Sequence, residues 1–232
     1  MVFTQDVPID PTTGDLPLLP SGQQLALETR GMVSSCGLGG KLWPAASVLC
    51  RHLRQHTDEL LGGSSAVLEL GCGLGAVGLY AAALGAHEVL LTDGGDDALL
   101  QVASANAQAN RDLLRGAVRI ERFSWGSHEL PTLQPSLILG SDVTYARASH
   151  SALCASLHAI LARGSRDAAQ PAIRALLAHE HRRILRPDGG PEDEALEHFH
   201  EVAVAARLQV STRYTARMPT RVISILEVAL GM

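Results

Sequence analysis

The sequence predicts an α/β protein built on a mostly parallel, seven-stranded sheet with helices on both faces. Three observations indicate this fold class: short apolar runs alternate with helix-like segments from residue 66 onward, a glycine-rich turn follows the first run, and acidic residues close two of the runs. The 232 residues suffice for one such domain, and 46% of them are hydrophobic, as in a globular core. We expect a main domain over residues 37–232, preceded by an arm over residues 1–36.

The first segments of the chain lack this alternation. Residues 1–22 are rich in Pro, Thr, Asp and Gly, which is typical of an extended arm. Gln24–Thr29 alternates apolar and polar residues and could form a short edge strand. Gly37–Gly40 predicts a flexible turn, and the helical spacing of apolar residues over Leu42–His56 predicts a helix.

Strands and helices are then expected in turn. Five short apolar runs bounded by turn residues predict strands at Ala66–Leu70, Glu88–Thr92, Val118–Phe123, Ser136–Ser141 and Ile173–His179. Helices are expected at Ala76–Leu84, Asp96–Asn110, Ser149–Leu161 and Pro191–Ala206; the second and fourth have acids near their positive N-terminal ends. The last runs, Gln209–Tyr214 and Val222–Leu230, leave no room for a connecting helix and predict an antiparallel hairpin.

Composition limits the classes of partner. A net charge of −5 and a pI near 6.0 argue against a nucleic-acid binder and suit a basic protein or peptide. Cys36, Cys50, Cys72 and Cys154 are scattered, which predicts neither a metal site nor a disulfide framework and favours a reduced intracellular chain. The sequence shows no membrane-length apolar run and no signal peptide, so we expect a cytoplasmic protein without membrane contact. Nothing in it requires an oligomer, and we expect a monomer.

Residues 67–79, VLELGCGLGAVGL, predict a nucleotide site. Gly73–Gly78 satisfies GxGxxG, in which a dehydrogenase holds a pyrophosphate. Glu69–Gly75 also reads as the ExGxGxG of an S-adenosylmethionine (SAM) site, where Glu69 supplies an acid for the methionyl ammonium. Asp93 ends the second strand and can accept both ribose hydroxyls in either class, so it supports a nucleotide without choosing one.

Two further features favour SAM. Ser124-Trp125 ends the third strand, where a planar ring could lie against adenine. Asp142 and Tyr145 share one turn after the fourth strand, at the edge of a parallel sheet where ligands bind. The alternative is that Asp142 caps a helix and Tyr145 is a packed residue.

Together the motifs resemble the seven-β-strand protein lysine methyltransferases, often called methyltransferase family 16. The resemblance rests on GKLWPAA, VLELGCGLGAVGLYAAALGA, LTD, ALLQVASANAQAN, SWG, LGSDVTY and LLAHEHR, which extend from about residue 37 toward the end of the chain. Trp43 combined with the DxxY motif, Asp142 to Tyr145, is more specific than the glycine loop. Family members modify lysines on heat-shock chaperones, valosin-containing protein, translation elongation factors and calmodulin, and a few relatives modify histidine or arginine.

The resemblance implies a Rossmann-like SAM-dependent methyltransferase fold, SAM as cofactor, and a protein substrate such as a chaperone, an ATPase or a translation factor. It also implies residue roles. The cofactor would be bound by Trp43, Glu69, Gly71, Cys72, Gly73, Asp93, Ser124, Trp125 and Ser141, and the target lysine by Asp142 and Tyr145. One departure is Ser124, which stands where the family usually has an acid that contacts the adenine amino group.

Two other polar groups near the end of the fifth strand allow more than one interpretation. His179 and His181 point to one face of the strand, as metal ligands would, but no third ligand is evident and the family uses no metal. We therefore expect no metal site. Arg182-Arg183 is interpreted as a solvated face or as a rim contact for the partner.

The expected reaction is methyl transfer to a neutral lysine amine held in line with the methyl group. Asp142 would attract and orient the ammonium, although an ordinary carboxylate is a poor general base for it. Three alternatives stay open: a methyltransferase acting on histidine, arginine or a small molecule, a non-catalytic SAM-binding module, and a dehydrogenase. The last leaves Glu69, Trp125 and the DxxY motif unexplained.

Overall fold

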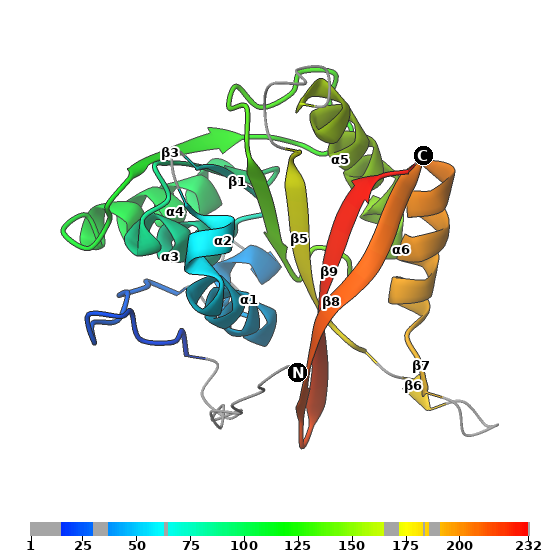
Figure 1. Ribbon diagram of the computed structural model, residues 1–232, viewed down its shortest axis with the longest axis horizontal. Coiled ribbons are helices and arrows are strands. Elements are labelled where there is room, and N and C mark those ends of the chain that lie inside the picture. The colour runs from blue at the N-terminus through cyan, green and yellow to red at the C-terminus, as the bar shows by residue number, and fades with distance from the viewer. Residues whose placement is uncertain are drawn as a thin grey trace.

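The computed structural model describes residues 15–29, 37–62, 65–164, 172–182, 184–185 and 191–231. Within them, seven strands form one sheet in the order β3-β2-β1-β4-β5-β9-β8 (Figure 1). The strands are β1 (Ala66–Leu70), β2 (Glu88–Asp93), β3 (Ala117–Arg122), β4 (Leu137–Ser141), β5 (Arg174–Glu180), β8 (Leu208–Met218) and β9 (Arg221–Leu230). β1 to β5 pair in parallel, whereas β9 pairs antiparallel with both β5 and β8. The predicted sheet and its C-terminal hairpin are therefore confirmed.

Helices cover both faces of the sheet, as predicted (Figure 1). One face carries α1 (Pro44–Gln55), α3 (Ala76–Leu84) and α4 (Asp97–Ala109), and the other carries α5 (His150–Gly164) and α6 (Glu194–Ala205). Alternate residues of each central strand point to opposite faces, so Val67 packs under α3 while Leu68 and Leu70 belong to the core beneath α5 and α6. None of the described helices is long and apolar enough to cross a membrane.

The predicted edge strand at Gln24–Thr29 is wrong. This segment is extended but pairs with no strand, because its backbone bonds to two amide side chains of α4. The N–H of Ala26 donates to Oδ1 of Asn110 at 2.8 Å and that of Glu28 to Oδ1 of Asn106 at 2.7 Å, and both amides donate back to carbonyls of the segment. The arm is thus described only in part, since residues 1–14 and 30–36 lie outside the described ranges.

Other boundaries differ locally from the predicted ones. The predicted helix over Leu42–His56 begins at Pro44 and is followed by the short α2 (Thr57–Leu60). The helix predicted from Pro191 begins at Glu194, because Pro191–Glu192 forms β7, which pairs with β6 (Ile184–Leu185). Asp193 caps α6 by accepting the N–H of Leu196 at 3.1 Å. Short 3-10 turns, η1 (Gly37–Gly40) and η2 (Arg147–Ser149), precede α1 and α5.

Candidate active site

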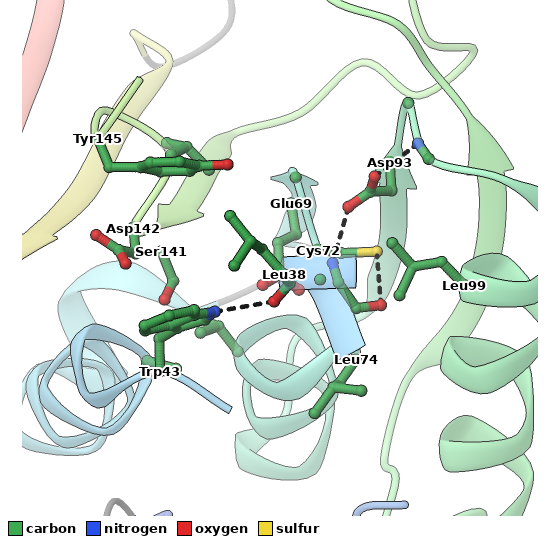
Figure 2. Close-up of a pocket in the computed structure, with 18 of the residues that line it drawn as sticks. Leu38, Trp43, Glu69, Cys72, Leu74, Asp93, Leu99, Ser141, Asp142 and Tyr145 are labelled. Carbon is green, nitrogen blue, oxygen red and sulfur yellow. Dashed lines mark hydrogen bonds between the residues drawn. The ribbon is translucent and has the colours of Figure 1, made fainter. Parts of the chain in front are cut away.

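A pocket of about 790 Å³ opens at the carboxyl ends of the parallel strands (Figure 2). A volume of this size suits a nucleotide-sized ligand. All eleven residues that the sequence predicted for the site line it: Trp43, Glu69, Gly71, Cys72, Gly73, Asp93, Ser124, Trp125, Ser141, Asp142 and Tyr145. In Figure 2, Trp43, Ser141, Asp142 and Tyr145 lie on one side of the pocket and Asp93 and Leu99 on the other.

The glycine loop after β1 needs glycine for both conformation and space. Gly71 and Gly73 have φ angles of +64° and +52°, which residues with a side chain rarely adopt. A Cβ atom on Gly71 would lie 2.8 Å from Val143 and 3.0 Å from Trp125, and one on Gly73 would lie 2.8 Å from the carbonyl of Gly39. The loop is therefore packed against three other parts of the pocket wall.

Asp93 ties the glycine loop to the segment that follows β2. Its Oδ2 accepts the N–H of Gly73 at 2.9 Å, and its Oδ1 accepts the N–H of Gly95 at 2.8 Å (Figure 2). Each carboxylate oxygen can accept more than one hydrogen bond, so both can still receive bonds from a ligand. The two backbone bonds fix the carboxylate at the pocket wall.

Glu69 is a buried acid beneath the same loop. Its Oε2 accepts the N–H of Gly78, in the first turn of α3, at 2.7 Å. Burial, assisted by the charge of Asp93, raises the pKa of Glu69 to about 8, although the bond from Gly78 opposes this. The carboxyl is therefore largely protonated at neutral pH, and a cation bound in the pocket would favour its ionised form.

Two tryptophans border the pocket from opposite elements. Trp43 precedes α1, and its indole N–H donates to the carbonyl of Leu38 at 3.0 Å. The ammonium of Lys41 lies 4.8 Å from the centre of its ring. Trp125, which follows β3, packs near Gly71 and is partly buried. Both rings leave part of their surface facing the cavity.

Asp142 adopts a strained backbone directly after β4. Its φ of +54° is rare for a residue with a side chain, and its N–H donates to the carbonyl of Ala178 at 2.7 Å. The side chain caps no helix, because η2 begins after Ala146 and has no side-chain cap. Tyr145 is 41% exposed, so it is no packed core residue. Both alternative interpretations from the sequence are therefore excluded.

The carboxylate of Asp142 is bound by Arg182, which lies just beyond β5. The guanidinium donates two bonds, Nη1 to Oδ1 at 3.0 Å and Nη2 to Oδ2 at 2.6 Å. It also lies over the ring of Tyr145, 5.3 Å from its centre. Arg182 is therefore more than a solvated face, since its side chain lines the pocket and pairs with Asp142, whereas its role as a rim contact for the partner stays a prediction. Arg183 lies outside the described residues.

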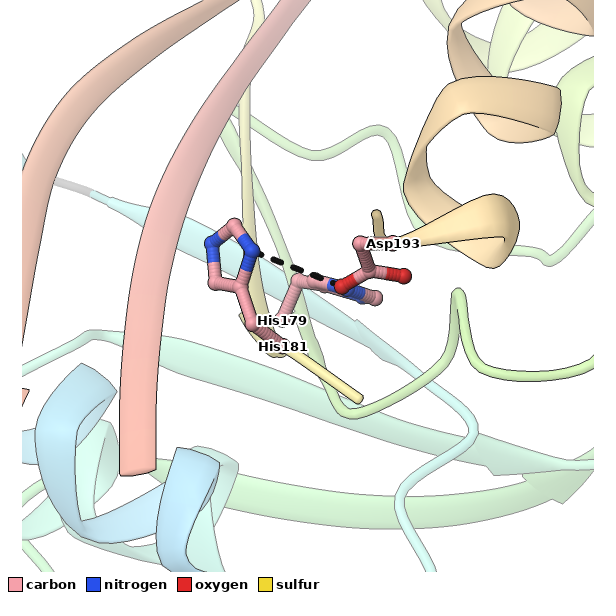
Figure 3. Close-up of side chains that lie close together, drawn as sticks. All are labelled: His179, His181 and Asp193. Atoms are coloured by element: carbon pink, nitrogen blue, oxygen red, sulfur yellow. Dashed lines mark hydrogen bonds and ion pairs between the residues drawn. The ribbon is translucent and has the colours of Figure 1, made fainter. Parts of the chain in front are cut away.

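Behind this pair lies a polar cluster of His179, His181 and Asp193, whose donor atoms are within 4.8 Å of one another (Figure 3). The fully buried His179 bonds through Nδ1 to the hydroxyl of Thr144 at 2.7 Å and through Nε2 to Asp193 at 2.8 Å. His181 bonds through Nε2 to the Ser224 hydroxyl at 2.8 Å. The interpretation that no third ligand is evident is therefore wrong, because Asp193 brings a carboxylate to the two histidines.

Asp193 also connects this cluster to Arg182. Burial favours the neutral acid, but the hydrogen bond and charge of His179 outweigh it and lower the pKa of Asp193 to about 2. The resulting carboxylate accepts the backbone N–H of Arg182 at 3.2 Å. No pattern in the sequence indicates this contact, because the two residues belong to different elements and follow no known motif.

Comparison with solved structures identifies the fold as that of Rossmann-like SAM-dependent methyltransferases. A putative RNA methyltransferase from Pyrococcus horikoshii has a TM-score of 0.55 at 15% identity, over 88% of this chain and 92% of that one. Magnesium protoporphyrin IX methyltransferase from Synechocystis, solved with S-adenosylhomocysteine, has a TM-score of 0.55 at 14% identity, over 81% and 82% of the two chains.

Sequence comparison then gives the family. The family model described as "Lysine methyltransferase" matches residues 21–184, more than half of the chain, and the protein belongs to this family. Protein N-lysine methyltransferase METTL21A from Danio rerio is 36% identical over 124 residues, 52% of this chain and 55% of that one. Histone-arginine methyltransferase METTL23 from Mus musculus is 30% identical over 147 residues, 62% and 56% of the two chains. The chain thus matches about half the length of these curated relatives.

Proposed function

We propose that the protein is a SAM-dependent methyltransferase that modifies a lysine side chain of another protein. The observation that carries the proposal is the convergence of the glycine loop, Asp93, Trp43 and the DxxY turn on one pocket. Family membership and the methyltransferase fold support the same reaction. Protein N-lysine methyltransferases among the relatives support lysine as the acceptor.

The glycine loop leaves room for SAM because two of its residues, Gly71 and Gly73, have no side chain. Gly71 and Gly73 leave free the space that a Cβ atom would fill, so the loop backbone can approach the methionyl part. Glu69 would balance its ammonium, and Asp93 would accept the ribose hydroxyls. The remaining contacts we propose are Cys72 beside the methionyl part, Ser124 and Trp125 at the adenine, and Trp43 and Ser141 near the reactive end.

SAM supplies an electrophilic methyl group when it is bound. The residues of this chain then have to present a neutral amine in line with that group, because a lysine is mostly protonated at pH 7. Asp142 and Tyr145 lie on the side of the pocket opposite Asp93 (Figure 2). We propose that this side receives the acceptor lysine, with the carboxylate contacting the nitrogen and the ring contacting the methylenes. We assign them positioning of the amine, and leave its proton to water.

To test this function, the protein is incubated with methyl-labelled SAM and a lysate of the cells in which it naturally occurs, and the labelled proteins are identified. The expected result is one labelled protein in which mass spectrometry places the methyl group on lysine. Asp93→Ala should abolish both the label and the rise in melting temperature caused by SAM. A melting temperature raised by NAD and unaffected by SAM would contradict the proposal.

A second candidate is methyl transfer to arginine. One relative is named a histone-arginine methyltransferase and is 30% identical over 62% of this chain. An arginine acceptor would use the same pocket, since a guanidinium can also bind a carboxylate and lie on a tyrosine ring. The mass of labelled peptides and the residue that carries the methyl group separate the two candidates.

The partner we propose is a basic region of an intracellular protein, such as a chaperone, an ATPase or a translation factor. The net charge of −5 supports attraction to a basic surface, and one relative is named an EEF1A lysine methyltransferase. Among the described residues Cys50, Cys72 and Cys154 are free and buried, which supports a reducing compartment, and we propose the cytoplasm. We further propose that the enzyme acts as a monomer.

A further inference from the structure

The target-lysine position proposed above already holds a cation from the chain itself. Arg182 donates two parallel bonds to Asp142, at 3.0 and 2.6 Å, and lies over the ring of Tyr145. A carboxylate paired with an aromatic face is also what an incoming lysine ammonium would bind. Arg182 therefore makes the two contacts that the acceptor needs.

The contact is more than a surface ion pair. The side chain of Asp142 is only 4% exposed, and its backbone has a φ of +54°, which is strained for a residue with a side chain. Two-pronged bonds between arginine and a carboxylate are geometrically specific and stronger than bonds between neutral groups. An incoming ammonium would find both oxygens of Asp142 already bonded and the positive guanidinium beside them, so it would bind more weakly while Arg182 is in place.

The backbone of Arg182 is anchored, whereas its side chain is partly exposed. Its N–H is bound by Asp193, which is itself held by His179 and by the first turn of α6 (Figure 3). The side chain of Arg182 is 39% exposed, so the guanidinium can move into water without opening the core. An anchored backbone with a long, part-exposed side chain lets the guanidinium leave Asp142 and return.

We propose that Arg182 is a specificity-determining residue that competes with the target lysine for Asp142 and must be displaced before transfer. This inference rests on the proposed lysine acceptor. A free amine has little binding energy with which to displace the guanidinium, whereas a protein that docks on the rim of the pocket gains that energy from the rest of its interface. The competition therefore selects protein-bound lysines over free lysine and other small amines.

A binding experiment without methyl transfer tests the competition. The protein is saturated with S-adenosylhomocysteine and titrated with Nα-acetyl-lysine methylamide, with binding followed by NMR. Arg182→Ala should bind this amine about three- to tenfold more tightly than the wild type, because a part-exposed ion pair no longer has to be broken. The norleucine analogue, which lacks the amine, should show no gain.

Two matched variants separate competition from a general change of charge. Lys41→Ala also removes a positive charge from the pocket wall, but Lys41 lies over Trp43 and makes no bond to Asp142. The affinity of this variant for the amine should therefore rise less than about twofold. In the Asp142→Asn background, Arg182→Ala should bring no gain, because the contested carboxylate is gone. A thermal melt of each variant verifies that it is folded.

The opposite results would overturn the proposal. If Arg182→Ala binds the amine equally, more weakly or not at all, Arg182 orients Asp142 and does not compete for it. A gain of the same size in Lys41→Ala, or in the Asp142→Asn background, would assign the effect to net charge. Failure of the lysine assignment is seen separately, because the position of the methyl group on the product is determined by the wild-type protein with SAM.

Discussion

The two ends of the pocket are built in different ways. At the proposed cofactor end, Asp93 and Glu69 bond to backbone N–H groups of the glycine loop, the residues after β2 and α3. At the proposed acceptor end, Asp142 bonds to the side chain of Arg182, a residue 40 positions later in the chain. If the proposed roles are right, the cofactor site is largely preformed, whereas the contacts of the acceptor site have to exchange when the substrate arrives.

The largest expected effect is a loss of methyl transfer when the proposed acceptor end is altered. Asp142→Ala should lower methyl transfer by about a hundredfold, because a misplaced acceptor amine costs that much when positioning supplies much of the rate. Both kcat and kcat/KM should fall together, as they do for an interaction made at the reacting group. Steady-state kinetics at saturating SAM measures this, and full activity in Asp142→Ala would place the acceptor elsewhere.

Trp125 should affect the cofactor end alone. Trp125→Ala removes a ring that borders the pocket, and we expect it to weaken SAM binding by about 1–3 kcal/mol, by analogy with the stacking of a base on an aromatic residue. The effect should be large here because Ser124 provides no acid for the adenine amino group. Calorimetry measures the loss, and an unchanged affinity would show that the ring packs against Gly71 without contacting the cofactor.

The glycine loop offers a comparison between two glycines with positive φ. Gly71→Ala should weaken SAM binding by about tenfold, since left-handed backbone costs a residue with a side chain about 1–2 kcal/mol and the new Cβ would lie 2.8 Å from Val143. Gly85→Ala is the matched control, because Gly85 has a φ of +121°, ends α3 and has nothing within 4 Å of its Cβ position. It should lower the melting temperature and leave the affinity for SAM unchanged.

The smallest expected effect is the pH dependence that Glu69 gives to the cofactor end. Because its pKa is about 8 in the free protein, binding the SAM ammonium requires loss of a proton, and affinity should fall by at most about tenfold from pH 7 to pH 6. Glu69→Gln should bind SAM more weakly and remove this slope. A wild-type affinity that does not change over this range would show that Glu69 stays protonated beneath the bound cofactor.

The same pKa has a consequence for stability with the opposite sign. Between the ordinary pKa of 4.5 and about 8, the folded protein binds the proton of Glu69 more tightly than the unfolded chain does. The free energy of unfolding of the SAM-free protein therefore decreases as pH rises through this window. Glu69→Gln should lessen that decrease, because a neutral amide has no proton to lose.

The proposed cofactor end of the pocket could be predicted from the sequence more fully than the proposed acceptor end. Buried parallel strands are short apolar runs, and a glycine loop with an acid one strand later is a local pattern, so β1, β2 and the pocket wall they form could be found without coordinates. The contacts of Arg182 with Asp142 and of Asp193 with His179 join side chains from separate elements and leave no periodic signal. They could not be predicted from spacing.

The prediction of an edge strand at Gln24–Thr29 was wrong for a related reason. Gln24–Thr29 has the alternation of a strand, but its hydrogen-bond partners are the amide side chains of Asn106 and Asn110, about 80 residues away. Alternation reports that one side of a segment is buried and does not report what the backbone bonds to. The start of α6 was misplaced because the acids at 192–194 fit a helix start at any of three positions, and Asp193 is the one that caps it.

The division of the pocket is tested most directly by calorimetry of SAM binding to two single variants, Asp93→Ala and Asp142→Ala. We expect Asp93→Ala to show no measurable binding and Asp142→Ala to bind SAM within about twofold of the wild type. Loss of binding in Asp142→Ala, or retention in Asp93→Ala, would contradict the assignment of the two carboxylates to acceptor and cofactor.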